Sequence, residues 1–365
     1  MERVRENWSA LLVLALLIGG ATYIHTIDTG LGSFLWIVAG IVVLVALLGP
    51  GVRTATQPVW SKWKRSRREA ITGYMFAAPF IIGFLVFTFG PMLFSLYASF
   101  SKYDIINPPV WKGWNYNYGF IFQHDPNFPV ALRNTFWYVL VKTPVIIIVS
   151  LIFALLLNQR VPGVRFFRTI FYMPTVVTGV AAIFLWVWVL NPRGILNSAL
   201  GALHAYQPLW FYDPAWTKPG LVVMSVWYLG APMLILLAGL NGIPKSLYEA
   251  AEVEGAGIIR KFRNITLPML SPTLFFIILT NIIGAFQVFN SAYVISTSSG
   301  VSNTQLPGDP DQSLLFYEVY MYTKFAAPVR DVGYACALAW ILFVIIMIIT
   351  GIQLYLSRRW VYYES

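Results

Sequence analysis

Residues 244–272 read PKSLYEAAEVEGAGIIRKFRNITLPMLSP and lie between two long apolar runs. Pro244 suits the first position of a helix, because the N–H that proline lacks would be unpaired there in any case. An apolar and small-residue stripe follows at helical spacing, formed by Leu247, Ala250, Ala251 and Glu254. Gly255 then allows the left-handed conformation that commonly ends a helix. We therefore expect a first short helix that stops at this glycine.

A second short helix is expected after Gly257. Its apolar positions are Ile258, Ile259, Phe262 and Ile265, and we expect Pro268 to end it. Helices shorter than roughly 12–15 residues are marginal alone in water. The pair therefore needs a surface to dock against, and both a partner protein and the lipid headgroup layer remain open on physical grounds.

The spacing of this stretch resembles the cytoplasmic coupling loop of ABC importer permeases. The pattern is Glu-Ala-Ala, two residues, Glu-Gly-Ala, five residues, then Phe262, and the string from Gly239 to Ala251 is similar to the carbohydrate-uptake branch. Glu254 departs from that pattern, in which Asp is usual. The resemblance implies that the loop, residues 244–268, fits a cleft on a separate ATPase subunit, with Glu249 and Gly255 most important. The implied interface comprises Leu247, Tyr248, Glu249, Ala250, Ala251, Glu254, Gly255, Ala256, Phe262 and Pro268.

Composition indicates an all-α polytopic membrane protein. Hydrophobic residues make up 58% of the chain and charged residues only 11%, whereas about a quarter is usual in soluble domains. Apolar runs long enough to cross a bilayer recur, and we expect about eight transmembrane helices. They run over Leu11–Ile24, Phe34–Leu48, Met75–Phe100, Thr135–Leu157, Thr169–Leu190, Gly220–Leu240, Met269–Ile295 and Gly333–Leu356.

Three parts follow from this pattern. Residues 1–52 form an N-terminal transmembrane hairpin; a cleaved signal peptide is the alternative for the first run, but a second apolar run follows within ten residues. Residues 53–74 form a basic amphipathic elbow whose Trp, Lys and Arg suit anionic lipid headgroups better than nucleic acid. Residues 75–360 form the permease core, and the resemblance covers about residues 70–360.

The distribution of cations predicts the orientation in the membrane. With the N-terminus inside, 17 of the 25 Lys and Arg residues fall in inner segments, which places both termini and the 244–268 loop in the cytoplasm. These 17 are Arg3, Arg5, Arg53, Lys62, Lys64, Arg65, Arg67, Arg68, Arg160, Arg165, Arg168, Lys245, Arg260, Lys261, Arg263, Arg358 and Arg359. This orientation follows without the resemblance and agrees with it.

Polar side chains within apolar spans are candidates for a substrate path, since they are otherwise costly there. The candidates are Ser225, Trp227, Tyr228, Gln287, Asn290 and Tyr293. On a continuous helix Gln287, Asn290 and Tyr293 share a face, and Asn281 lies opposite Asn290. Interhelical hydrogen bonding is the alternative role for Gln287 and Asn290, and the favoured one for Asn281. Lys142 also lies within a span, where its side chain could extend to the interface.

The sequence offers no catalytic or metal centre. It has no Gly-x4-Gly-Lys-Ser/Thr phosphate loop, and His25, His124 and His204 have no acidic or Cys neighbours at ligand spacing. A membrane enzyme would need a cluster of titratable groups near one face. A secondary transporter driven by an ion gradient is the main alternative, although acidic residues fall in loops or near span ends.

The resemblance implies the partners. They are a second permease, two ATPase subunits that hold ATP and Mg, and an external binding protein that delivers a sugar, so this chain is a non-enzymatic subunit with no cofactor of its own. The expected location is a bacterial or archaeal cell membrane. The chain resembles the larger permease of maltose-type importers, although its 102–133 loop is too short for a large external domain. Monosaccharides, oligosaccharides, polyols and glycerol-phosphate-type solutes all remain open.

Overall fold

The computed structural model describes residues 65–159, 163–177, 179–298, 307–326 and 330–362. The predicted spans Leu11–Ile24 and Phe34–Leu48, and most of the basic elbow, lie outside these ranges. The chain divides into two units, one ending at Gly90 and one beginning at Pro91. Each unit is considered by itself.

The described part of the first unit is helical. Helix α3 spans Arg65–Phe84 and contains Pro79, and a π-helical segment, η1, covers Leu85–Phe89. Its aromatic side chains Phe76, Phe80 and Phe84 are exposed, as expected for a helix that faces lipid. The segment Phe76–Ser99 is long and apolar enough to cross a membrane, close to the predicted Met75–Phe100.

The second unit is a helical bundle with one very short β-ladder. Strands β1 (Ser101–Lys102) and β2 (Val110–Trp111) are antiparallel, with Ser101 opposite Trp111. The helical elements are α4 (Gly90–Ser99), η2 (Asn115–Gly119), α5 (Phe120–Gln123), α6 (Asn127–Leu157), α7 (Val164–Tyr172), η3 (Met173–Val176), α8 (Gly179–Val189), α9 (Ile195–Ala202), α10 (Pro214–Val226), α11 (Gly230–Gly242), α12 (Lys245–Val253), α13 (Ile258–Lys261), η4 (Phe262–Thr266), α14 (Leu267–Phe286), α15 (Asn290–Thr297), α16 (Tyr317–Ala326) and α17 (Val332–Ser357).

Within the described ranges, four helical segments could cross a membrane: Phe76–Ser99, Asn127–Leu157, Ile258–Thr297 and Val332–Ser357. Two further pairs would raise the number to six, but each is bent. The predicted span Thr169–Leu190 is not one straight helix, because the segments Val164–Val176 and Gly179–Val189 meet at 105°. The predicted count of eight is therefore not established.

The other bent pair joins α10 and α11. These helices meet at 49° within the predicted span Gly220–Leu240, next to its sequence Gly230-Ala231-Pro232. Pro232 lies in the first turn of α11, where a missing N–H costs nothing. Helix α10 begins earlier than predicted, at Pro214, because the Asp213 side chain accepts a 2.9 Å hydrogen bond from the Ala215 N–H and caps it.

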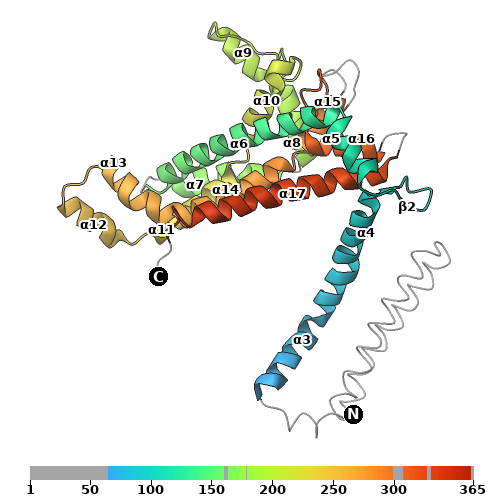
Figure 1. Cartoon of the computed structure of the whole chain (residues 1–365). Coiled ribbons are helices and arrows are strands. Elements are labelled where there is room, and N and C mark those ends of the chain that lie inside the picture. The colour runs from blue at the N-terminus through green and yellow to red at the C-terminus, as the bar shows by residue number, and fades with distance from the viewer. Residues whose placement is uncertain (1–64, 160–162, 178, 299–306, 327–329, 363–365) are drawn as a thin grey trace, which may run out of the picture. The chain divides into compact units, whose positions relative to one another are not determined.

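Two buried apolar clusters hold the bundle together along α6. One lies where the ends of α6 and α11 meet the start of α14, and includes Leu157, Leu240 and Leu270. The other includes residues of η2, α5, α10, α16 and α17. Figure 1 shows α12 and α13 projecting beyond one end of α6, α14 and α17, while β2, α5 and α16 lie at the opposite end.

That opposite end is more ordered than the loop expected over residues 102–133. The hydroxyls of Tyr320 and Tyr334 both donate to the buried carboxylate of Asp125. The Gly333 N–H donates to the Tyr103 carbonyl at 2.9 Å, and a Cβ on this glycine would come within 2.2 Å of the Ser101 carbonyl oxygen. The segment is thus fastened to α16 and α17, and α6 begins at Asn127, before the predicted Thr135.

Candidate functional site

The turn between α12 and α13 has the geometry that the sequence predicts. Gly255 has φ +73°, in the left-handed region. The Gly255 N–H donates to the Glu252 carbonyl at 3.0 Å, and the Ala256 N–H donates to the Ala251 carbonyl at 2.8 Å. These two bonds form a Schellman motif, which satisfies the last carbonyls of α12 and reverses the chain toward α13.

Few side-chain contacts fix α12 against the rest of the protein. The Tyr248 hydroxyl lies 2.9 Å from Thr266 Oγ1, and the Tyr248 ring packs against the apolar cluster that contains Leu157, Leu240 and Leu270. Lys261 Nζ forms an ion pair with Glu252 Oε1 at 2.8 Å across the two helices. The helix is therefore attached mainly at its Tyr248 side.

The remainder of α12 and α13 is exposed. No residue of α12 or α13 is buried, and Val253 is 90% exposed, Ile258 84% and Ile259 82%. Leu247, Glu249, Ala250, Glu254 and Gly255 are also exposed, while Ala251, Ala256, Phe262 and Pro268 are partly buried. Exposed apolar side chains grouped on a short helix pair are typical of surfaces that contact another protein or a membrane.

Both prolines at the borders of this stretch differ from expectation. Pro244 precedes α12 as its N-cap residue and does not occupy its first turn. Pro268 does not end the second helix: α13 continues through the π-helical η4 into α14. A π-helical turn contains one residue more than an α-helical turn and displaces the usual backbone hydrogen bonds. Pro268, which has no N–H to donate, is therefore accommodated directly after η4 without ending the helix.

The resulting helix is too long to lie wholly in the hydrocarbon core of a bilayer. From Ile258 to Phe286, where α14 ends, it measures about 43 Å at 1.5 Å per residue, against a hydrocarbon core of about 30 Å. Its first turns carry Arg260, Lys261 and Arg263, which favour water and headgroups. The charged first turns are therefore the part of this helix that suits a position outside the hydrocarbon core.

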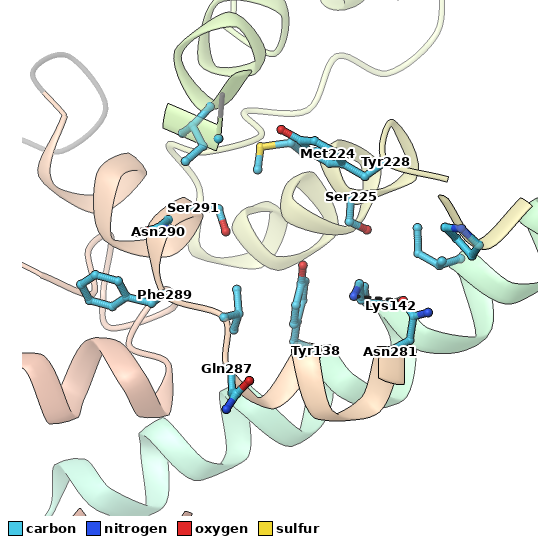
Figure 2. A pocket seen from close by; sticks show the side chains of 16 residues that line it. Tyr138, Lys142, Met224, Ser225, Tyr228, Asn281, Gln287, Phe289, Asn290 and Ser291 are labelled. Atoms are coloured by element: carbon cyan, nitrogen blue, oxygen red, sulfur yellow. Dashed lines mark hydrogen bonds between the residues drawn. The ribbon is translucent and has the colours of Figure 1, made fainter. Parts of the chain in front are cut away.

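A cavity of about 320 Å³ lies among α6, α10, α11, α14 and α15. The residues at its wall include four of the six predicted substrate-path candidates: Ser225, Tyr228, Gln287 and Asn290. Figure 2 shows Tyr138 and Ser225 pointing toward one another across it, and Lys142 beside Asn281. The remaining lining residues are Ile146, Gly179, Ile183, Met224, Pro232, Gly284, Val288, Phe289 and Ser291.

A break in the helix explains where the face assignment fails. Helix α14 ends at Phe286 and α15 begins at Asn290, so the two do not follow one continuous helical phase. Asn281 consequently lines the same cavity as Asn290, where the continuous helix placed them on opposite sides. The Asn281 amide also makes the expected interhelical bond, accepting from Lys142 Nζ at 3.5 Å.

Two predicted candidates lie outside the cavity wall. Tyr293 stacks on Phe289 at 5.2 Å between ring centroids and meets Tyr322 edge-on at 5.0 Å. Trp227 packs edge-on against Trp186 at 6.0 Å. Both therefore belong to aromatic contacts that support the helices, although Trp227 also touches the cavity residue Tyr228 through its ring.

Sequence reasoning missed the contribution of α6 to this cavity. Tyr138, Lys142 and Ile146 all line it, and they follow one another at intervals of four residues. That spacing defines one helix face and is visible in the sequence. The Lys142 ammonium lies beside Asn281 in the cavity.

The described residues contain no group of three His, Cys, Asp or Glu side chains placed to hold a metal ion. An exposed helix pair at one end and a polar cavity deeper in the bundle are instead what a solute-transporting membrane subunit needs. The fold and the two sites together define a multi-span helical permease.

Comparison with known proteins identifies the family. The chain belongs to the family "binding-protein-dependent transport system inner membrane component", which matches residues 146–362, more than half of the chain. It is therefore a permease subunit of an ABC importer, as the coupling-loop resemblance predicts. The ion-gradient alternative has no support among these relatives.

Three relatives illustrate the similarity. The probable ABC transporter permease YesP of Bacillus subtilis is 38% identical, over 83% of this chain and 96% of that protein. The lactose transport permease LacF of Rhizobium radiobacter is 30% identical, over 82% and 98%. The arabinooligosaccharides transport permease AraP of Halalkalibacterium halodurans is 30% identical, over 79% and 88%.

The fold is also that of a solved importer. A bacterial ABC transporter that imports the acidic polysaccharide alginate contains a chain with a TM-score of 0.68 and 22% identity, covering 83% of this chain and 99% of that one. A second structure of the alginate transporter includes its pentasaccharide-bound periplasmic protein. At this level of identity the likeness concerns the fold alone.

Proposed function

We propose that this chain forms part of the translocation path for a sugar or oligosaccharide, and that α12 and α13 dock into a separate ATPase subunit. The complete importer contains a second permease, which forms the rest of the translocation path, and two ATPase subunits. An external binding protein delivers the solute. ATP and Mg are held by the ATPases, and this chain catalyses no reaction. The sugar assignment draws on the named lactose and arabinooligosaccharides permeases.

The observation that carries the proposal is the exposed helix pair. Val253, Ile258 and Ile259 project exposed apolar side chains from the helix pair, next to the cations of Arg260, Lys261 and Arg263. A complementary cleft on an ATPase would bury these side chains, and full burial of such a group contributes about 1.5–3 kcal/mol. Differential contact of the same surface in two nucleotide states is what couples ATP use to transport.

The cavity supports the second half of the proposal. The side chains of Ser225, Tyr228, Gln287 and Asn290 can bond to sugar hydroxyls, and the apolar residues between them suit C–H faces. We predict that Gln287→Leu and Asn290→Leu each change the preference among sugars in an uptake assay while the protein still inserts. Unaltered uptake and preference in both variants would remove these amides from the path.

Both termini are proposed to lie in the cytoplasm with the helix pair. The C-terminal segment returns to the start of α14, where the Tyr362 N–H donates to Ser271 Oγ at 2.9 Å and Trp360 meets Phe275 at 6.1 Å. The C-terminus and α12 therefore leave the bundle at the same end. The excess of Lys and Arg in the same segments supports the cytoplasmic side.

Cysteine crosslinking tests the docking. The single native cysteine, Cys336, is first replaced by serine, and Ala250→Cys or Val253→Cys is introduced on α12. A crosslinker with one thiol-reactive end and one photoreactive end, which inserts into whatever group lies within reach, should then join this chain in native membranes to an ATPase identified by mass spectrometry. Ile106→Cys, 80% exposed at the opposite end of the bundle, is the matched control and should capture no ATPase. Failure of both α12 variants to capture one would refute the docking.

A further inference from the structure

Lys142 occupies the middle of the longest single α-helix in the described part of the chain. It is the central residue of α6, which runs from Asn127 to Leu157, and so lies about 22 Å from either end. Its ammonium lies at the cavity beside Asn281. Ionisable groups within membrane spans are usually functional.

No carboxylate in the cavity balances this ammonium. The lining residues include Lys142 but neither Asp nor Glu, and among the described residues no ion pair to Lys142 is formed. Its one hydrogen bond is the 3.5 Å contact with the neutral amide oxygen of Asn281. An ammonium has three N–H donors, so two remain to face the cavity.

Polar side chains surround the same space. Gln287 and Asn290, at its edge, are exposed, and the Ser225 hydroxyl already donates to the Val222 carbonyl at 2.7 Å. A solute that enters would thus meet hydroxyl and amide groups together with one unbalanced positive charge. A neutral solute would displace water from the Lys142 ammonium and leave its charge unpaired. A solute with a carboxylate would replace that water with a charge-assisted hydrogen bond.

We propose that this permease carries acidic saccharides, and that Lys142 pairs with the carboxylate of a uronic acid residue in this cavity. The inference rests on the proposed sugar-import function and narrows its substrate class. One ammonium balances one carboxylate, whereas a phosphate dianion would keep an excess negative charge. Asn281 orients the ammonium toward the cavity.

The test uses the complete importer, purified through a tag on this chain with the subunits that accompany it and reconstituted in liposomes. Two probe pools are offered: uronic acid oligosaccharides of two to five residues, and the same pool after reduction of its carboxyl groups to alcohols. ATP-dependent entry of each species is measured by mass spectrometry. The chain lengths and linkages of the two pools are identical, so their difference reports the carboxylate alone.

The wild-type importer is expected to accumulate the acidic pool at least tenfold faster than the reduced pool. Lys142→Met, which keeps the length of the side chain, should remove most of that preference, and Lys142→Arg should keep it. The matched control is Lys218→Met in α10, since Lys218 bonds to Asn134 Oδ1 at 3.0 Å outside the cavity. That control should leave the acidic-to-neutral ratio unchanged.

Three results would overturn the inference. Entry of neutral sugars in preference to acidic ones would exclude it while leaving sugar import intact. A preference for the acidic pool that survives Lys142→Met would show that the charge has no part in it. Equal loss of both pools in Lys142→Met would assign Lys142 to assembly, for example an ion pair with the second permease. If no saccharide of any kind enters, the proposed function fails as well, and that outcome is distinct from the other three.

Discussion

Replacement of Gly255 by alanine isolates the role of the turn between α12 and α13. Gly255 adopts φ +73°, and a Cβ built on it meets nothing within 4 Å. The substitution therefore adds no clash, and its cost is that of a left-handed conformation in an L-residue, about 1–2 kcal/mol. Loss of that amount changes the population of a conformation by a factor of about 5–30.

The side-chain contacts that hold α12 are too few to offset this free-energy cost. A single hydroxyl bond such as Tyr248–Thr266 contributes about 1 kcal/mol. In the Lys261–Glu252 ion pair the glutamate side chain is exposed to solvent, so the pair contributes only about 0–1 kcal/mol to stability. Because α12 has no buried residue, the penalty should disorder the turn without unfolding the bundle.

We therefore expect Gly255→Ala to lower substrate-stimulated ATP hydrolysis and uptake by about 5–30-fold, with an unchanged melting temperature. Gly255→Asn should fall between wild type and alanine, because Asn tolerates this conformation better. Gly257→Ala is the matched control: this glycine has φ −68° and ψ 171°, ordinary extended backbone, and a Cβ there also meets nothing within 4 Å.

The measurement is ATPase activity of the reconstituted importer, with hydrogen exchange over residues 245–257 as a direct readout of the turn. Faster exchange in Gly255→Ala, absent from Gly257→Ala, should accompany the loss of activity. Equal losses in both alanine variants would refute the conformational explanation, and so would full activity of Gly255→Ala.

Three further variants probe other parts of the chain. Tyr248→Phe removes the 2.9 Å hydroxyl contact with η4, and should speed hydrogen exchange in α12 while the bundle melts as before. Gly230→Ala places a Cβ 2.2 Å from the Phe171 carbonyl oxygen and should lower thermal stability by about 1–3 kcal/mol, whereas Gly242→Ala meets nothing within 4 Å and should not. Burial raises the pKa of the Glu318 carboxyl above its ordinary 4.5. The protonated carboxyl therefore contributes stability below pH 4.5, and this contribution is lost as the pH rises. Glu318→Gln should accordingly raise the melting temperature at neutral pH, and the gain should vanish in acid.

The sequence predicted the helix pair well because its signals are local. A stripe at helical spacing and a glycine suited to a positive φ are both readable within a few residues, and the turn at Gly255 has the expected conformation. Pro268 shows the limit of such rules. A proline normally ends a helix, yet the π-helical η4 accommodates this one, and its neighbours carry no sequence signal for a π turn.

The cavity was only half predictable for a similar reason. The helix break over Gln287–Phe289 contains neither Gly nor Pro, so nothing in its composition distinguishes it from helix interior. Every face assigned beyond that point was therefore rotated, which changed where Asn290 and Tyr293 lie relative to Asn281. Tyr138 and Lys142 were visible as an i, i+4 pair, but only tertiary packing shows that α6 turns this face toward α10 and α14.

Helices α11 and α14 connect the exposed helix pair, α12 and α13, to the cavity. Helix α12 follows α11 after only Ile243 and Pro244, and α13 continues through η4 into α14 without a loop. A Cβ on Gly239 would lie 2.8 Å from the Leu270 side chain, so α11 and α14 pack as closely as their backbones allow at the membrane end of this pair. Farther along, the same helices contribute Pro232 and Asn281 to the cavity wall. Because the connections on both sides of the helix pair are this short, we expect a displacement of the pair to tilt α11 and α14 together and to move two walls of the cavity relative to Lys142 on α6.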